Sequence, residues 1–368
     1  MTSHPLDPAT VKAMVDEHLA GFFRSTRAEL DPIDPFIAEL NAEIEDFVLG
    51  GGKRVRPLFA WAGYVGAVTS PGADPAGAEE DPSAVIEAVS ALELIQACAL
   101  IHDDIIDFSD TRRGYPTMHR RIESAHRARG WSGDGERFGT SVAILAGDLA
   151  LAWADDILAR SSISPAALSR AWTAWAPMRS EVIAGQILDI SIEAARDERP
   201  ESARRTILLK TAAYTIERPL HFGAAIGGAD DRLIAAYRRF GQLVGTAFQL
   251  RDDLLGVFGD PQVTGKPAGD DLREGKRTEL LAHALVHLDA TDPAAAARLR
   301  RGIGSATSDD EIAELSGIIA ATPAVAETEQ AIAELTRSGI EVLSAAELSP
   351  AVTGVLVDLA HAATDRRH

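Results

Sequence analysis

The 368-residue sequence has a single cysteine, no excess of positive charge and no long uninterrupted hydrophobic run. One cysteine, Cys98, excludes an internal disulfide and is typical of a reducing compartment. The 36 Lys and Arg residues against 55 Asp and Glu residues give a formal charge of -19, which argues against general nucleic-acid binding and against adhesion to an anionic membrane. Asp148 interrupts the stretch SVAILAGDLALAWA, and the N-terminus has no signal-peptide pattern. We therefore expect a soluble cytoplasmic protein without integral membrane association.

Strand-type alternation is also lacking, whereas helix-start signals recur. A capping Asp or Ser precedes a proline suited to the first helical turn six times, at Asp7-Pro8, Asp34-Pro35, Asp81-Pro82, Ser164-Pro165, Asp292-Pro293 and Ser349-Pro350. Between these signals apolar residues recur every three or four positions, and the glycines at 50–52 end one such stripe. We expect an all-α fold in a single domain over 1–368, with flexible ends at 1–8 and 363–368 and loops at 69–83, 126–139 and 260–277.

Two groups of aspartates follow apolar helical stretches. In LIHDDIIDFSDTRRG, Asp103 and Asp107 lie one turn apart at the end of a helix that starts near Pro82, so their like charges repel. A Mg²⁺ ion would relieve this repulsion, because it commonly takes one or two carboxylates plus phosphate oxygens. In FQLRDDLLGVFGD, Asp252 and Asp253 repeat the pattern. Each group alone could be a solvated acidic helix end, but the pair predicts a shared cavity with metal.

A local cationic cluster stands out in this acidic chain. In GGGKRVRP (50–57), glycines let the backbone approach a ligand closely, and Lys53 and Arg56 are charge-assisted donors for a phosphate group. Taken singly, each cation could be a solvated surface charge. Together with the aspartates they predict a pocket for two polyphosphate-like groups, one held largely through metal and one largely through Lys and Arg. The further cations are Arg112, Arg113, Lys210, Lys266, Lys276 and Arg277.

These motifs, in this order, resemble the all-trans isoprenyl diphosphate synthases over roughly residues 35 to 290, and look most like bacterial geranylgeranyl diphosphate synthases. The resemblance rests on FVLGGGKRVRPLFAWAGY, ELIQACALIHDDIIDFSDTRRG, AGQILDI, KTAAYT and FQLRDDLLGVFGDPQVTGKPAGDDLREGKRT. It implies antiparallel helices around a central cavity, a homodimer, and a reaction that joins isopentenyl diphosphate to dimethylallyl, geranyl or farnesyl diphosphate. It also implies three Mg²⁺ ions per active site when substrate is bound.

The resemblance assigns roles residue by residue. Asp103 and Asp107 would bind Mg²⁺ with Asp104 in support, and Asp252 would bind a further Mg²⁺ beside Asp253. The positions that match isopentenyl diphosphate contacts are Lys53, Arg56, Gln96 and Arg113. Those that match allylic diphosphate contacts are Arg112, Lys210, Thr211, Gln249, Lys266 and Lys276. Catalysis would then consist of stabilising the departing pyrophosphate and shielding an allylic carbocation from water.

Product length and two departures from the family pattern remain open at this point. Cys98 and Ala99 lie one turn before Asp103, where a bulky aromatic in the family tends to stop the chain at fifteen carbons. Their small size favours the twenty-carbon geranylgeranyl product over farnesyl or longer products, although both could simply permit close helix packing. Gly256 stands where many members have a third aspartate, which could weaken one magnesium site. Gln96 stands where histidine is frequent.

Two other functions are considered. A class I terpene cyclase would share the first aspartate motif, but its usual second metal motif of Asn or Asp with Ser and Glu is missing, and it has no need of the GGGKRVRP segment. A non-catalytic subunit that binds prenyl diphosphates is supported only by Gly256.

Overall fold

Two compact units make up the chain in the structure, a computed structural model that describes residues 6–70, 79–112, 114–260 and 268–365. Unit 1 consists of Met1–Thr173 and Phe222–Ala229, and unit 2 of Ala174–His221 and Asp230–His368. Two of the three boundaries fall inside the helices α8 (Pro165–Ala195) and α10 (Arg218–Ile226), and the third lies between α10 and the next helix. The described residues are almost entirely helical, so the all-α prediction is confirmed. The single-domain organisation stays a prediction.

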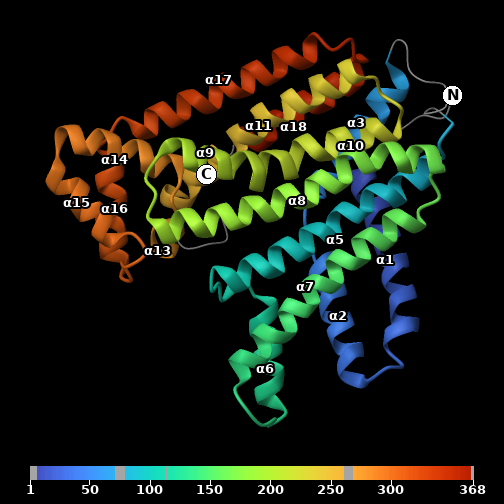
Figure 1. The fold of residues 1–368 in the computed structure, drawn as a ribbon, viewed down its shortest axis with the longest axis horizontal. Helices are drawn as coiled ribbons and strands as arrows, with labels where there is room; N and C mark the ends of the chain where they lie inside the picture. Colours follow the sequence, from blue (N-terminus) through green and yellow to red (C-terminus); the bar gives the residue numbers. More distant parts are fainter. Residues whose placement is uncertain (1–5, 71–78, 113, 261–267, 366–368) are drawn as a thin grey trace. The chain divides into compact units, whose positions relative to one another are not determined.

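Unit 1 is a set of helices around an aromatic and aliphatic core. Helix α5 packs along α7, and α6 packs against the first part of α7 (Figure 1). Trp61, Phe59 and Leu92 are fully buried in this unit. Its elements, besides parts of α8 and α10, are α1 (Pro8–Leu30), α2 (Pro35–Leu49), α3 (Val55–Thr69), α5 (Pro82–Ile106), β1 (Thr111–Arg112), β2 (Tyr115–Pro116), α6 (Met118–Ala128) and α7 (Gly135–Arg160).

Unit 2 is organised around α11 (Asp231–Phe258). This helix packs against the π-helix η1 (Ile207–Glu217), against α17 (Ala324–Ser344) and against α18 (Pro350–Thr364), and Figure 1 shows α17 lying along it. Tyr237 and Phe240 of α11 are fully buried. The other elements are α9 (Pro200–Thr206), α13 (Asp270–Glu274), α14 (Glu279–Thr291), α15 (Pro293–Gly302) and α16 (Asp309–Ala320).

The six predicted helix starts are confirmed, because each Asp or Ser accepts a backbone N–H of the first turn. Asp81, for example, accepts the N–H of Ser83 at 2.9 Å, and Ser164 accepts that of Ala167 at 3.1 Å. The predicted stop is also present, since α2 ends at Leu49 and Gly50 donates back to the Asp46 carbonyl. Of the ends predicted to be flexible, 1–8 and 363–368, residues 1–5 and 366–368 lie outside the described residues; helix α1 begins at Pro8 and α18 extends to Thr364.

The predicted loop at 126–139 is wrong in extent. Helix α6 continues to Ala128 and α7 begins at Gly135, so only residues 129–134 connect them. The polar composition misled the prediction, because Asp134 caps α7 through Glu136 and Arg137 N–H groups while Trp131 and Phe138 stack edge to face. In the stretch 260–277, residues 270–274 form the short helix α13, and 261–267 lie outside the described residues.

Helix α5 is the one most like a membrane span by composition within the described ranges, with a mean hydropathy of 1.9 over its most apolar window. In the structure 72% of that window is buried, and the same helix carries the buried acids Glu93 and Asp104. Both features are those of a core helix, and Asp103 and Asp107 lie at its C-terminal end.

Candidate active site

The first aspartate group lies in the last turn of α5. The Asp107 backbone N–H donates to the Asp103 carbonyl at 2.8 Å and ends the helix, and the chain then leaves through Phe108 at φ 54°. Asp103 keeps 22% of its side chain exposed, whereas Asp104 is 1% exposed. The two predicted metal-binding residues, Asp103 and Asp107, therefore lie one helical turn apart, and the Asp103 carboxylate is partly exposed to solvent.

Asp104 is used to hold Arg112. The Arg112 guanidinium donates to the Asp104 carboxylate through Nε at 2.8 Å and Nη2 at 2.6 Å, and the same Nη2 is 3.7 Å from Asp103 Oδ2. Burial raises the pKa of the Asp104 carboxyl, although the hydrogen bond from Arg112 opposes that shift. Asp104 thus fixes a cation, Arg112, beside Asp103.

The GGGKRVRP segment makes a turn that few residues other than glycine adopt. Gly51 and Gly52 have φ values of 150° and 113°, and Arg54 is left-handed at φ 51°. After this turn Lys53 is exposed and Arg56 is half-buried on α3. The Lys53 side chain is thus exposed to solvent, and its binding of an anion stays a prediction.

Arg54, in the GGGKRVRP segment, makes buried contacts that the sequence analysis did not predict. It is 3% exposed, and it donates to Glu93 on α5, to Asp16 on α1 and to the Val48 carbonyl at 2.7, 2.7 and 2.8 Å. Because Glu93 lies one turn before Gln96, these bonds tie the cationic loop to the helix that carries Gln96. Its place next to Lys53 in the sequence drew attention to this segment. Its partners Asp16 and Glu93 are distant in sequence, so spacing could not predict these contacts.

Cys98 contacts His102, which lies on the same helix and bonds to α7. Its Sγ is 3.7 Å from Nδ1 of His102, whose Nε2–H donates to the Ile144 carbonyl on α7 at 3.0 Å. Gly147 leaves room for the His102 ring in this position, because a Cβ would lie 2.2 Å from His102 Nε2. Burial raises the pKa of the Cys98 thiol to about 12. This contact is compatible with a packing role for Cys98, and its role in product length stays a prediction; Ala99 is half-buried.

In unit 2, a chain of hydrogen bonds joins three predicted site residues. Thr211 on η1 donates to Gln249 Oε1 at 2.6 Å, and Gln249 Nε2 donates to Asp253 Oδ1 at 2.8 Å. Close approach of η1 and α11 makes this possible, because a Cβ on Gly245 would lie 2.5 Å from the Ala212 Cα. Residues of both η1 and α11 therefore fix the position of the Gln249 side chain.

Asp253 is buried next to the half-buried Asp252. It is 3% exposed, and within the described ranges its Oδ2 has no hydrogen-bond partner. Burial, and then the charge of Asp271, raises the pKa of Asp253 well above its usual range. A nearby cation would stabilise the ionised form.

The predicted lysines of unit 2 are each paired with a carboxylate that the prediction did not include. Lys210 Nζ donates to Asp189 at 2.6 Å, and Lys276 Nζ lies 2.7 Å from Glu274. Gly185 lets α8 approach η1, since a Cβ at position 185 would lie 2.5 Å from the backbone nitrogen of Lys210. The AGQILDI motif already contained Asp189, four residues after Gly185, so the signal was present in the sequence.

The predicted site residues fall into two groups. Unit 1 holds Lys53, Arg56, Gln96, Cys98, Ala99, Asp103, Asp104, Asp107 and Arg112. Unit 2 holds Lys210, Thr211, Gln249, Asp252, Asp253 and Lys276. Arg113 and Lys266 lie outside the described residues.

The carboxylates fit a hard cation that other oxygen ligands complete. In the part of the chain that the structure describes, no three His, Cys, Asp or Glu side chains converge as a ready metal site. Mg²⁺ in proteins typically takes one or two carboxylates and fills its remaining positions with water and phosphate oxygens. Asp103 with Asp107, and Asp252 beside the unpartnered Asp253 oxygen, are donors of that kind.

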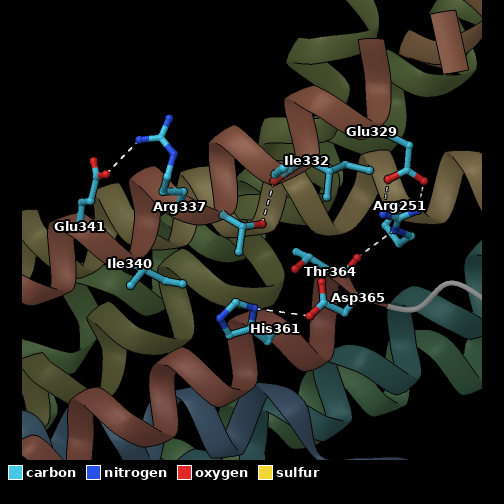
Figure 2. Close-up of a pocket in the computed structure, with 11 residues that line it drawn as sticks. Arg251, Glu329, Ile332, Arg337, Ile340, Glu341, His361, Thr364 and Asp365 are labelled. Atoms are coloured by element: carbon cyan, nitrogen blue, oxygen red, sulfur yellow. Dashed lines mark hydrogen bonds and ion pairs between the residues drawn. The ribbon is translucent and has the colours of Figure 1, made fainter. Parts of the chain in front are cut away.

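A pocket of about 380 Å³ in unit 2 involves none of the predicted site residues (Figure 2). Arg251 at its edge donates to both oxygens of Glu329 at 2.5 and 2.6 Å and to the Thr364 carbonyl at 2.9 Å. These bonds connect α11, α17 and the end of α18, next to Asp252. The pocket residues are Arg251, Glu329, Ile332, Ala333, Thr336, Arg337, Ile340, Glu341, His361, Thr364 and Asp365.

Known families and proteins that are similar to this chain match most of its length. The family model described as polyprenyl synthetase matches residues 37–320. The chain is 32% identical over 325 residues to a (2E,6E)-farnesyl diphosphate synthase of Mycobacterium bovis, covering 86% of this chain and 80% of that protein. It is 29% identical to a nonaprenyl diphosphate synthase of Mycobacterium tuberculosis, covering 89% of each.

A solved structure is more similar still. A geranylgeranyl pyrophosphate synthase from Corynebacterium glutamicum, complexed with isoprenyl diphosphate and magnesium, is 49% identical with a TM-score of 0.94. The match covers 98% of this chain and 100% of that one.

Proposed function

Because the chain belongs to the polyprenyl synthetase family and is a prenyltransferase, we propose that it condenses isopentenyl diphosphate with allylic diphosphates to give geranylgeranyl diphosphate. The observation that carries the proposal is the group at the end of α5. There an open carboxylate, Asp103, stands 3.7 Å from a guanidinium, Arg112, that a buried aspartate holds in place. A Mg²⁺-bound diphosphate needs both groups, a carboxylate for the metal ion and a guanidinium for the phosphate oxygens.

The reaction asks different things of different residues. Asp103, Asp107 and Asp252 would hold Mg²⁺, which when bound neutralises charge on the departing pyrophosphate. The residues that bind and orient the allylic diphosphate are Arg112, Lys210, Thr211, Gln249, Lys266 and Lys276. Lys53, Arg56 and Gln96 bind isopentenyl diphosphate and place its double bond for attack. We propose three Mg²⁺ ions per site when substrate is bound, by analogy with the family.

The twenty-carbon product is supported by the 49% identity to the Corynebacterium glutamicum enzyme and by the small side chain of Ala99. The farnesyl and nonaprenyl synthases among the relatives make a fifteen-carbon or a longer product the alternatives. Incubating the protein with Mg²⁺, isopentenyl diphosphate and dimethylallyl diphosphate, followed by product sizing, separates these cases. A final product of any length other than twenty carbons would refute the assignment.

Enlarging Ala99 is expected to shorten the product. The variant Ala99→Phe should shift the main product from twenty to fifteen carbons, because an aromatic ring one turn before Asp103 takes up about the length of one isoprene unit, ~5 Å. Reverse-phase chromatography of the dephosphorylated products measures the shift. Ala99→Ser, of nearly unchanged size, is the control and should keep the original product. An unchanged product with phenylalanine would contradict the role of Ala99.

A homodimer is proposed on the basis of the family, and exposed apolar side chains on α7 support it. Leu145 is 62% exposed and Ile144 is 43% exposed. The variant Leu145→Glu is expected to shift the protein from dimer to monomer in light scattering, because a buried interface does not tolerate an unpaired charge. Ser141→Glu, an exposed position one turn earlier, should remain dimeric. A monomeric wild type, or a dimer that Leu145→Glu leaves intact, would rule out this surface.

A further inference from the structure

We infer that Asp271 on α13 supplies the carboxylate that the second aspartate group lacks at Gly256, and so acts with Asp252 and Asp253 in binding Mg²⁺. The inference rests on the proposed function, since it assumes that this group binds Mg²⁺ with a diphosphate. It concerns a residue that neither the sequence analysis nor the family resemblance assigned.

The space beside Gly256 is already occupied. A Cβ on Gly256 would lie 2.0 Å from Asp271 Oδ2, 2.4 Å from its Cγ and 2.8 Å from its Oδ1. An aspartate side chain at 256 would therefore collide with the Asp271 carboxylate. The missing side chain at Gly256 and the Asp271 carboxylate are thus two parts of one arrangement, in which a carboxylate from α13 stands where one from α11 is missing.

The backbone holds Asp271 in this position. Its carbonyl accepts the N–H groups of Gly275 and Lys276 at 3.1 and 3.0 Å, which closes a tight turn directly before a predicted diphosphate-binding lysine. The next residue, Leu272, is 2% exposed in the core of unit 2, and its carbonyl accepts the Gly304 N–H at 2.8 Å. Asp271 is therefore carried by a fixed element, although α13 has only five residues.

A second observation at the same place points to a cation. Asp253 is 3% exposed and bonded to Gln249 through Oδ1, and within the described ranges its Oδ2 lacks a hydrogen-bond partner. Leaving a buried carboxylate oxygen without a partner is costly, and nearby negative charge adds to that cost. The charge of Asp271 acts on Asp253 in this sense. A divalent cation shared by the group would offset both costs.

The test counts bound metal rather than product. Mn²⁺, used in place of Mg²⁺, is titrated into the protein with inorganic pyrophosphate, and bound Mn²⁺ is followed by electron paramagnetic resonance. For Asp271→Asn we expect one Mn²⁺ to bind about 10- to 100-fold more weakly than in the wild type, the usual range for disturbing a metal site's ligand shell. The matched control is Asp270→Asn, its neighbour on α13, which should bind as the wild type does.

A swapped variant distinguishes this role from a structural one. The double variant Gly256→Asp with Asp271→Gly returns a carboxylate to the same space from α11, so we expect it to recover Mn²⁺ affinity relative to Gly256→Ala with Asp271→Gly. If Asp271→Asn fails to fold, as judged by circular dichroism, this pair of double variants decides the question.

Two kinds of result would overturn the inference, and they can be told apart. Unchanged Mn²⁺ binding by Asp271→Asn, or no difference between the two double variants, would overturn the role of Asp271 while leaving the proposed function standing. A wild-type protein that binds no Mn²⁺ with pyrophosphate and elongates no primer would remove the proposed function and this inference together.

Discussion

Replacing Asp103 by alanine is expected to lower kcat by at least ~100-fold while leaving the melting temperature nearly unchanged. The Asp103 carboxylate stands 22% exposed at the end of α5, so its loss removes a metal ligand without leaving a hole in the core. Stabilising the charge of a transferring group through a metal is worth several kcal/mol, and each 1.36 kcal/mol changes the rate tenfold. Steady-state kinetics with isopentenyl and farnesyl diphosphates measure the effect.

The control for this prediction is Asp110→Ala. Asp110 follows in the same segment, 74% exposed and paired with Arg120, but it has no predicted catalytic role. Its variant should retain kcat within a few-fold. Equal rates for Asp103→Ala and wild type would refute the metal role of the first aspartate group.

Replacing Arg54 by alanine is expected to lower the free energy of unfolding by about 3 kcal/mol or more. Arg54 and Glu93 are 3% and 8% exposed, so removing the guanidinium leaves a buried carboxylate without its cation. The Val48 carbonyl at the end of α2 also loses its donor. Urea unfolding followed by tryptophan fluorescence measures the change.

Arg27→Ala is the matched control in the same unit, because Arg27 is 49% exposed where it pairs with Glu45. Exposed pairs contribute about 0–1 kcal/mol, so this variant should unfold almost as the wild type does. If the two variants lose the same small amount, Arg54 does not anchor the cationic loop. A raised KM for isopentenyl diphosphate in Arg54→Lys would further connect the anchor to Lys53.

Local signals in the sequence were sufficient for the helices and for the aspartate group on α5. The cap-and-proline pairs predicted six helix starts because those interactions involve residues only two or three positions apart. The same holds for Asp103 and Asp107, whose spacing places them on consecutive turns. Composition failed where tertiary contacts override it, as in α6, which is rich in charge and was assigned in part to a loop.

The contacts that hold the site could not be predicted in this way. Arg54 finds Glu93 39 positions along the chain, and the space beside Gly256 is filled by Asp271 from another helix. Spacing says which residues share a helix face, but it does not say which distant side chain meets that face. In the sequence, Gly256 therefore indicated a weakened metal site, because nothing showed that Asp271 lies beside it.

The most direct test of the account is elongation itself. Purified protein is incubated with Mg²⁺, labelled isopentenyl diphosphate and, separately, dimethylallyl, geranyl and farnesyl diphosphate, and both the product length and the released pyrophosphate are measured. We predict label in products lengthened by whole five-carbon units up to twenty carbons, with one pyrophosphate released per unit added. No elongation of any of the three primers would contradict the account.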